Sequence, residues 1–257
     1  MKALWNSFVV AFAMFSKIPM PRADWSRDNM KYMMCFFPFV GTAVGILFAG
    51  VACIGNYFFF EPVFVAALMT AVPVLVTGGI HVDGLLDTAD AMSSWQERER
   101  RLEILKDSRA GAFAVITACV YFLTLFGAYV QVQKNSAAVF VLALGFMVSR
   151  CLSGIGVVSL PKAKEDGTVA DFSRNSRERT VRAVLLVYLA ALLVGMVCIQ
   201  PVYGIAAFGT AVLVFWYYRH MALKYFGGTT GDLAGFFVCL CECLMAVALA
   251  VVGTVVV

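Results

Sequence analysis

Charged side chains are scarce in this chain of 257 residues, of which 14% are charged and 61% are hydrophobic. A typical soluble domain carries about 25% charged residues, so the composition excludes an ordinary soluble protein. The sequence also lacks a low-complexity segment and a separate polar domain. It shows no cleavable signal peptide, because the apolar run at residues 8–15 is short and has no small-residue cleavage site. We therefore expect one integral membrane domain over residues 1–257.

Histidine occurs only twice, and the eight cysteines do not form a recognisable disulfide or metal pattern. Nearly all of them lie within apolar runs, where a thiol behaves as a small hydrophobic group. The alternate spacing of Cys239, Cys241 and Cys243 distributes the three around a helix instead of placing them on one face. We expect no metal site there.

Seven apolar runs predict an all-α fold, a polytopic bundle of about seven transmembrane helices. The runs lie at residues 35–58, 62–79, 112–132, 137–160, 183–200, 202–218 and 233–257. Residues 1–18 are too short to cross a hydrocarbon core of ~30 Å, so they predict a short amphipathic or re-entrant helix. In the first run, Pro38, Gly41 and Gly45 predict a kink and close helix packing.

The connections between these runs alternate in charge. Those at residues 17–31, 81–110, 161–182 and 219–232 carry four, five, six and two basic residues, whereas the intervening ones carry none or one. By the positive-inside rule the basic connections face the cytoplasm, as expected for the inner membrane of a prokaryote. Residues 162–182 are expected to form a cytoplasmic loop that helps to cover an anionic substrate.

The polar chemistry is concentrated at residues 77–113, which hold seven of the 16 acidic residues. Asp83, Asp87 and Asp90 are spaced four and then three apart, so a helix would place them on one face. Like charges on one face repel one another, which favours a bound cation, and carboxylate oxygens suit Mg²⁺. The pattern is close to that of membrane enzymes that displace a nucleoside monophosphate from an activated alcohol. We interpret it as a magnesium and pyrophosphate site in which Asp90 binds metal or accepts a proton.

Further charges follow at the same membrane edge. Residues 97–101 are typical of a solvated helix with a pair between Glu97 and Arg101. Asp107 is a further candidate metal ligand, and Lys106 and Arg109 are candidate phosphate-binding cations.

Arg150 and Glu242 are the ionisable residues within apolar runs. A charge at that depth costs at least ~2.5 kcal/mol unless it finds water or a partner. The sequence leaves two roles open for Arg150: phosphate binding, or a structural ion pair with Glu242.

Two other stretches offer candidate substrate contacts. The glycine-rich connection 227–232 includes Gly228, Thr230 and Asp232 and opens directly into the last apolar run, where backbone amides can bind an anion. His81 lies two residues before Asp83 and away from the aspartate face. It is a candidate base or substrate contact, or else a polar residue satisfied at the membrane edge.

Several of these stretches resemble one known family. Residues 78–90, Gly-Gly-Ile-His-Val-Asp-Gly-Leu-Leu-Asp-Thr-Ala-Asp, and residues 100–113, Arg-Arg-Leu-Glu-Ile-Leu-Lys-Asp-Ser-Arg-Ala-Gly-Ala-Phe, closely resemble the signature of the adenosylcobinamide-GDP ribazoletransferases, the cobalamin synthases. Matches at residues 18–21, 36–41, 149–150 and 227–232 extend the resemblance from the first connection to the last run. Ser16-Lys17 and residues 91–94 depart from the pattern, but neither departure touches the acidic residues.

The resemblance implies an integral membrane, Mg²⁺-dependent transferase. Its substrates would be adenosylcobinamide-GDP and α-ribazole or α-ribazole 5′-phosphate, and its products adenosylcobalamin or adenosylcobalamin 5′-phosphate and GMP. Its partners would be these small molecules and the lipid bilayer, with no nucleic acid, and a homo-oligomer stays open. Two other functions fit the residues alone: a phosphotransferase acting on a nucleotide-activated lipid, and an ion-coupled transporter that uses Arg150, Glu242 and the aspartates.

Overall fold

Each long apolar run forms a helix, as it must where no water is available to bind the backbone N–H and C=O groups. The computed structural model describes residues 2–22, 25–107, 109–163 and 177–255. The long helices are α3 (Met33–Tyr57), α4 (Pro62–Thr77), α7 (Ala112–Val132), α8 (Ser136–Ser159), α10 (Glu178–Ile199), α11 (Pro201–Met221) and α12 (Gly231–Gly253). The shorter helices are α1 (Lys2–Phe15), α2 (Arg27–Met30), α5 (Ile80–Ser93) and α6 (Arg98–Ile104), with a π-helical turn η1 (Ala222–Phe226).

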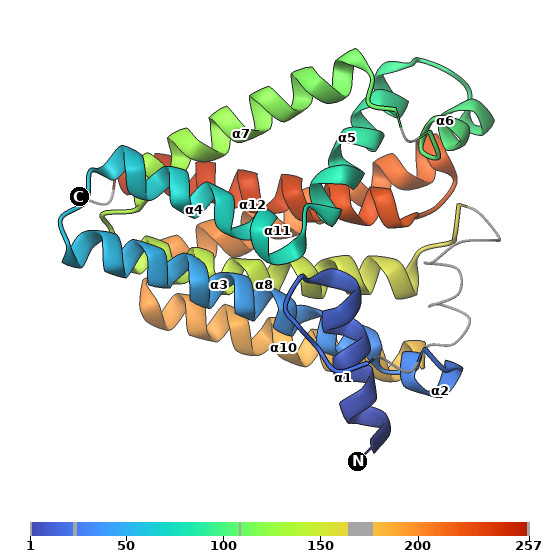
Figure 1. Cartoon of the computed structure of the whole chain (residues 1–257), viewed down its shortest axis with the longest axis horizontal. Helices are drawn as coiled ribbons and strands as arrows, with labels where there is room; N and C mark the ends of the chain where they lie inside the picture. Colours follow the sequence, from blue (N-terminus) through green and yellow to red (C-terminus); the bar gives the residue numbers. More distant parts are fainter. Residues whose placement is uncertain (1, 23–24, 108, 164–176, 256–257) are drawn as a thin grey trace.

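Six of the described helices are long and apolar enough to cross a membrane. A seventh span is reached if the bent pair α4–α5 counts as one crossing, since α4 alone has 16 residues and extends about 24 Å at 1.5 Å per residue. At its end the chain bends by 94° into α5, which runs crosswise beside α12 toward one end of the bundle (Figure 1). The prediction of a polytopic bundle of about seven spans, preceded by a short helix, is confirmed.

Helix α8 forms the centre of the bundle and packs against α3, α10, α11 and α12. Close approach to α3 depends on glycine, because a Cβ atom on Gly41 would lie 2.2 Å from the carbonyl oxygen of Phe146. A Cβ atom on Gly45 would lie 2.3 Å from the carbonyl oxygen of Ala143. The close packing expected from these glycines is therefore present.

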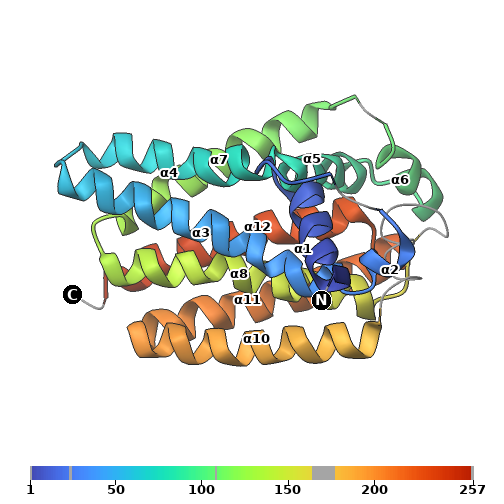
Figure 2. The ribbon, with the colours of Figure 1, turned by 60° about the horizontal axis from the view of Figure 1, so that its bottom comes forward.

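The basic connections and the connections with few charges lie at opposite ends of the bundle (Figures 1 and 2). The turns after α3, α7 and α10 lie at one end, near the C-terminus. Helices α2 and α6 and the turn η1 lie at the opposite end, together with the described parts of all four basic connections. Residues 164–176 of the expected covering loop lie outside the described residues. The acidic helix α5 is thus at the basic end.

Candidate active site

Two glycines set the direction of the acidic helix. Gly78 and Gly79 follow α4 with φ values of +67° and +80°, in the left-handed region that glycine adopts without a Cβ clash. Gly78 is also covered by a side chain, since a Cβ atom there would lie 2.2 Å from Cε of Lys17. Helix α4 therefore ends at Thr77, and α5 starts at Ile80 in a new direction across the bundle.

Helix α5 carries Asp83, Asp87 and Asp90 as the spacing predicted. Asp83 is exposed, and Asp87 and Asp90 are half-buried. Partial burial raises the pKa of Asp87 to about 6, and repulsion from Asp83, Asp232 and Asp90 adds to the rise. The structure thus adds a fourth carboxylate, from the start of α12, to the group found in the sequence.

Helices α5 and α12 cross at backbone contact. A Cβ atom on Gly84 would lie 2.5 Å from the carbonyl oxygen of Asp232, and one on Gly235 would lie 3.2 Å from the backbone of His81. Glycines at both positions allow the close approach. This crossing brings Asp232 beside the α5 carboxylates, although 142 or more residues separate them in sequence.

Asp90 has a structural contact that the sequence did not reveal. Its carboxylate accepts hydrogen bonds from the backbone N–H groups of Gly111 at 2.6 Å and Ala114 at 2.9 Å, at the first turn of α7. A carboxylate at this point satisfies free N–H groups and complements the helix dipole. Gly111 has no room for a side chain, because its Cβ would lie 2.7 Å from Asp90 Oδ1. Asp90 therefore links α5 to α7, and its catalytic or metal-binding role stays a prediction.

The glycine-rich connection before α12 is held by its own contacts. Backbone hydrogen bonds join Thr229 to Pro161 and Ala163 to Thr229, and the Thr229 hydroxyl lies 2.5 Å from the Tyr218 hydroxyl. Gly228 is pressed against this strand-like pairing, and a Cβ atom there would lie 2.4 Å from the Pro161 carbonyl oxygen.

Thr230 and Asp232 complete the start of α12. The Thr230 hydroxyl caps the helix by accepting the Leu233 N–H at 3.2 Å, and it donates to Asp232 at 3.4 Å. Of the three predicted contacts in this connection, Asp232 borders the cavity described next, whereas Gly228 and Thr230 are buried.

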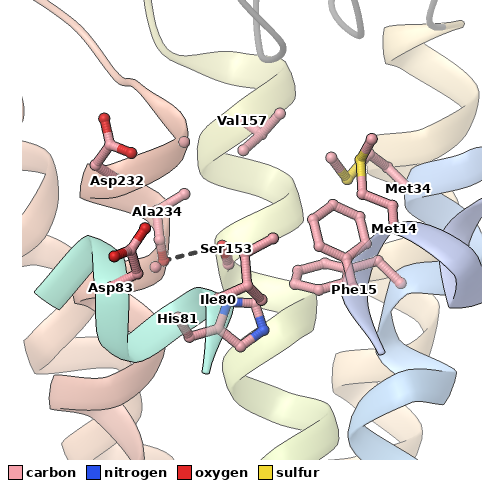
Figure 3. A pocket seen from close by; sticks show the side chains of 13 residues that line it. Met14, Phe15, Met34, Ile80, His81, Asp83, Ser153, Val157, Asp232 and Ala234 are labelled. Atoms are coloured by element: carbon pink, nitrogen blue, oxygen red, sulfur yellow. Dashed lines mark hydrogen bonds between the residues drawn. The ribbon is translucent and has the colours of Figure 1, made fainter. Parts of the chain in front are cut away.

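A cavity of about 360 Å³ opens beside the acidic residues (Figure 3). Helices α1, α3, α5, α8 and α12 all contribute to it. Asp83 and Asp232 lie on one side, and His81 and Ser153 lie deeper among apolar side chains. The apolar wall consists of Met14, Phe15, Met34, Phe37, Ile80, Val157 and Ala234.

His81 is 7% exposed, and its Nε2 atom has no hydrogen-bond partner among the described residues. Burial, followed by the charge of Arg150, lowers the pKa of His81 well below its ordinary value. The imidazole is therefore neutral at physiological pH.

Asp107, Lys106 and Arg109 do not join this group in the described structure. Asp107 pairs with Arg109 through contacts of 2.8 and 3.0 Å, and these bonds lower the pKa of Asp107 to about 2. All three side chains are exposed. No described contact connects Asp107 with the α5 carboxylates, so its role as a metal ligand stays a prediction. On α6 the described ion pair is Arg100–Glu103, not the expected Glu97–Arg101.

Arg150 and Glu242 form an ion pair in the interior of the bundle. The Arg150 guanidinium also donates to the Phe146 carbonyl oxygen at 2.8 Å, and the Ser149 hydroxyl donates to Glu242 at 2.8 Å. Arg150 is fully buried and does not line the cavity. The structural pairing is thus present, and the burial does not favour phosphate binding by Arg150.

Lys17 is a further candidate for a phosphate-binding cation, which the sequence alone did not indicate. Its backbone N–H donates to the Val76 carbonyl oxygen at 2.8 Å, and its side chain covers Gly78. It shares with Asp83 a second cavity of about 540 Å³ next to the first. The only sequence signal was its position at the end of the N-terminal helix, just before Ile18-Pro19.

Magnesium fits these oxygen donors through one or two carboxylates. Within the described ranges, no three acidic, histidine or cysteine side chains converge as a closed metal cage requires. Mg²⁺ does not need a cage, since it keeps several waters and is completed by substrate phosphates. The repulsion that raises the pKa of Asp87 is the kind that a cation relieves.

Comparison with known proteins shows the family to which the chain belongs. The model of the cobalamin-5-phosphate synthase family matches residues 7–250. The chain belongs to this family. An adenosylcobinamide-GDP ribazoletransferase of Lachnoclostridium phytofermentans is 42% identical over 98% of this chain and 96% of its own length. Enzymes of the same name from Clostridium botulinum (strain Alaska E43 / Type E3) and Geobacillus thermodenitrificans are 32% and 31% identical, covering 92% and 91% of this chain and 93% and 91% of their own. No solved structure matches the chain.

The match to the cobalamin-5-phosphate synthase family model begins within α1 and ends within α12, so it includes every residue that lines the cavity. It agrees with the resemblance found in the sequence. It supports an adenosylcobinamide-GDP ribazoletransferase over the lipid phosphotransferase and the transporter.

Proposed function

We propose that the protein is an Mg²⁺-dependent transferase that joins adenosylcobinamide-GDP to α-ribazole or α-ribazole 5′-phosphate, with release of GMP. The relatives' names supply adenosylcobinamide-GDP and a ribazole acceptor, and the family description supports the phosphorylated form. The observation that carries the site assignment is the meeting of α5 and α12, which brings Asp83, Asp87, Asp90 and Asp232 near one another, with Asp83 and Asp232 lining one cavity.

The reaction requires attack by a ribose hydroxyl oxygen on the phosphorus atom that carries cobinamide. The bond from that phosphorus to the bridging oxygen breaks, and GMP leaves with the oxygen and its electron pair. The hydroxyl proton passes to a carboxylate. A bound Mg²⁺ would neutralise the pyrophosphate and the leaving group.

The chain's own residues have distinct tasks in this scheme. One or two of the carboxylates of Asp83, Asp87 and Asp232 would hold the metal and thereby the pyrophosphate. Asp90 fixes the acidic face by anchoring α5 to the first turn of α7. Lys17, at the adjoining cavity, is placed to attract a phosphate group, as a lysine ammonium commonly does.

We further propose that the end of the bundle holding α5 faces the cytoplasm of a prokaryotic cell, in the inner membrane. The support is the gathering of the basic connections at that end (Figure 1). Single cysteines at Trp95 and Phe59, in a background lacking the native cysteines, test this orientation. Both side chains are highly exposed, at 88% and 91%, and they lie in connections at opposite ends. An impermeant thiol reagent added outside intact cells should label only the Phe59 site.

Activity is tested with the purified protein in detergent, adenosylcobinamide-GDP, α-ribazole 5′-phosphate and Mg²⁺. Production of GMP and adenosylcobalamin 5′-phosphate in equal amounts is expected, with none in excess chelator. Release of CMP from a nucleotide-activated lipid, without any response to corrinoid, would instead identify a lipid phosphotransferase.

A further inference from the structure

The cavity beside the acidic residues has two chemically different parts. Asp83 and Asp232 form a carboxylate edge, and the deeper wall is made mostly of methionine, phenylalanine and aliphatic side chains (Figure 3). Such an arrangement suits a ligand with an apolar ring at one end and charged or hydroxylated groups at the other. A pyrophosphate would stay at the edge, because burying its charge among these apolar groups is costly.

The deep part is aromatic on one side. The rings of Phe15 and Phe37 lie 4.3 Å apart between centroids, and His81 lies 6.4 Å from Phe15 and 5.9 Å from Phe37. Aromatic side chains favour flat rings, which they contact face to face or edge to face. The deep part therefore favours a flat heteroaromatic ligand over a sugar or a phosphate.

His81 supplies one unsatisfied polar atom in these surroundings. Its side chain is 7% exposed, and Nε2 is buried without a partner among the described residues. A buried polar atom without a partner is costly. Nε2 is itself shielded from the cavity that the His81 side chain lines, so a ligand would meet it once the imidazole ring turns toward the cavity. The other polar side chain in the deep part is Ser153, whose hydroxyl donates to the Ala234 carbonyl oxygen at 3.5 Å, and the rest of the wall is apolar.

The size of the cavity distinguishes between the two substrates of the proposed reaction. At about 360 Å³ it is near the lower end of the ~300–1,000 Å³ typical of small-molecule sites. A two-ring base fits such a volume, whereas a corrin macrocycle with its peripheral side chains is far larger. The corrinoid must therefore stay outside the deep part.

We propose that this cavity binds the benzimidazole base of the acceptor nucleoside, with His81 Nε2 donating a hydrogen bond to the ring nitrogen that does not carry the ribose. This inference rests on the proposed function, because that function supplies the nucleoside. It places the base deep in the bundle and the ribose at the edge, beside Asp83 and Asp232. His81 then selects and orients the acceptor, and it does not act as the base suggested for it from the sequence.

The decisive comparison uses two acceptors with the unaltered protein. One is α-ribazole 5′-phosphate, and the other is the analogue in which the free ring nitrogen is replaced by C–H. Loss of one buried hydrogen bond should lower kcat/KM for the analogue about tenfold. The KM for adenosylcobinamide-GDP should be the same with either acceptor.

A substitution at His81 should abolish this discrimination. His81→Phe keeps a flat ring but removes the donor, so kcat/KM for the natural acceptor should fall about tenfold to the value of the analogue. The matched control is His220→Phe, since His220 is the other histidine and is exposed at the end of α11. It should discriminate between the acceptors as the unaltered protein does.

Ile80→Trp gives a second variant that does not disturb the interior, because Ile80 lines the cavity and is 42% exposed. The larger ring should obstruct the cavity and raise the KM for the acceptor at least fivefold, with the KM for adenosylcobinamide-GDP unchanged. This variant and the acceptor comparison test the inference even where His81→Phe does not fold.

The outcomes separate this inference from the proposed function. If the unaltered protein makes no GMP from the two substrates, the proposed function is wrong. If it makes GMP but uses both acceptors equally well, the inference about His81 is wrong and the function stands. If Ile80→Trp raises the KM for adenosylcobinamide-GDP instead, the cavity binds the corrinoid substrate.

Discussion

Gly84 and Asp232 meet at the point where α5 crosses α12, with a Cβ atom on Gly84 only 2.5 Å from the Asp232 carbonyl oxygen. The contact joins the acidic helix to the last span. We expect Gly84→Ala to separate the two helices, because backbone atoms at the crossing cannot rotate away as a side chain can. It should destabilise the protein by about 1–3 kcal/mol and reduce turnover at least tenfold.

Gly50→Ala is the matched control for this substitution. Gly50 also lies inside a helix, α3, but an added Cβ atom there meets nothing within 4 Å. Thermal unfolding in detergent and GMP release should both stay near those of the unaltered protein. Equal effects of the two substitutions would show that the α5–α12 crossing is not important for the site.

Asp87 lies at the centre of the acidic group, and we expect Asp87→Ala to lower turnover about 100-fold or more, with the protein still inserted in the membrane. The reason is the loss of a charge that holds the cation and the pyrophosphate. GMP release is the measurement, with Glu99→Gln on the exposed face of α6 as control. Near-normal rates for Asp87→Ala would contradict the assignment of the site.

The pH dependence follows from the pKa of Asp87, which is raised to about 6 from 3.8. Without metal, the folded protein binds a proton here between pH 6 and pH 4, whereas the unfolded chain does not. Stability in chelator should therefore rise as the pH falls from 7 to 5, and this rise should be smaller in Asp87→Asn. Because protons compete with the cation, Mg²⁺ should bind more weakly below pH 6.

Thermal unfolding at several pH values, with chelator and with Mg²⁺, tests both statements. Mg²⁺ should raise the midpoint more at pH 7.5 than at pH 5.5. A metal effect that is the same at both pH values would contradict a site in which Asp87 binds the cation.

Substitution of Asp90 should reduce the stability of the protein more than substitution of Asp87 does. Asp90 accepts two backbone hydrogen bonds at the start of α7, so Asp90→Ala should cost about 1–2 kcal/mol of stability. Asp90→Asn keeps an acceptor and should cost less. Thermal unfolding measures both, and Asp87→Ala is the comparison because its carboxylate caps no helix in the described contacts. If Asp90→Ala unfolds at the midpoint of the unaltered protein, the contact to α7 is not stabilising.

The sequence predicted most of this arrangement because hydrophobic runs and helical spacing are local properties. The runs predicted the spans, and the spacing of Asp83, Asp87 and Asp90 predicted one helix, which residues 80–93 form. The sequence could not show that Asp232 joins them, since this depends on the close crossing that Gly84 and Gly235 permit. It also could not show whether Arg150 would meet a phosphate or Glu242, because Glu242 is 92 residues away in sequence and a phosphate would come from the substrate.

The buried pair Arg150–Glu242 gives the last prediction. Glu242→Gln leaves the Arg150 charge uncompensated in the interior, and removing one partner of a buried pair costs about 3–5 kcal/mol, so little folded protein should be recovered. The double variant Arg150→Met with Glu242→Leu removes both charges and should recover much of the folded protein, since apolar replacement of a whole pair is often neutral. If the pair is structural, the purified double variant should keep its KM for adenosylcobinamide-GDP within about threefold. A rise of 100-fold in this KM, in a protein that unfolds normally, would mean that Arg150 binds the substrate phosphate after all.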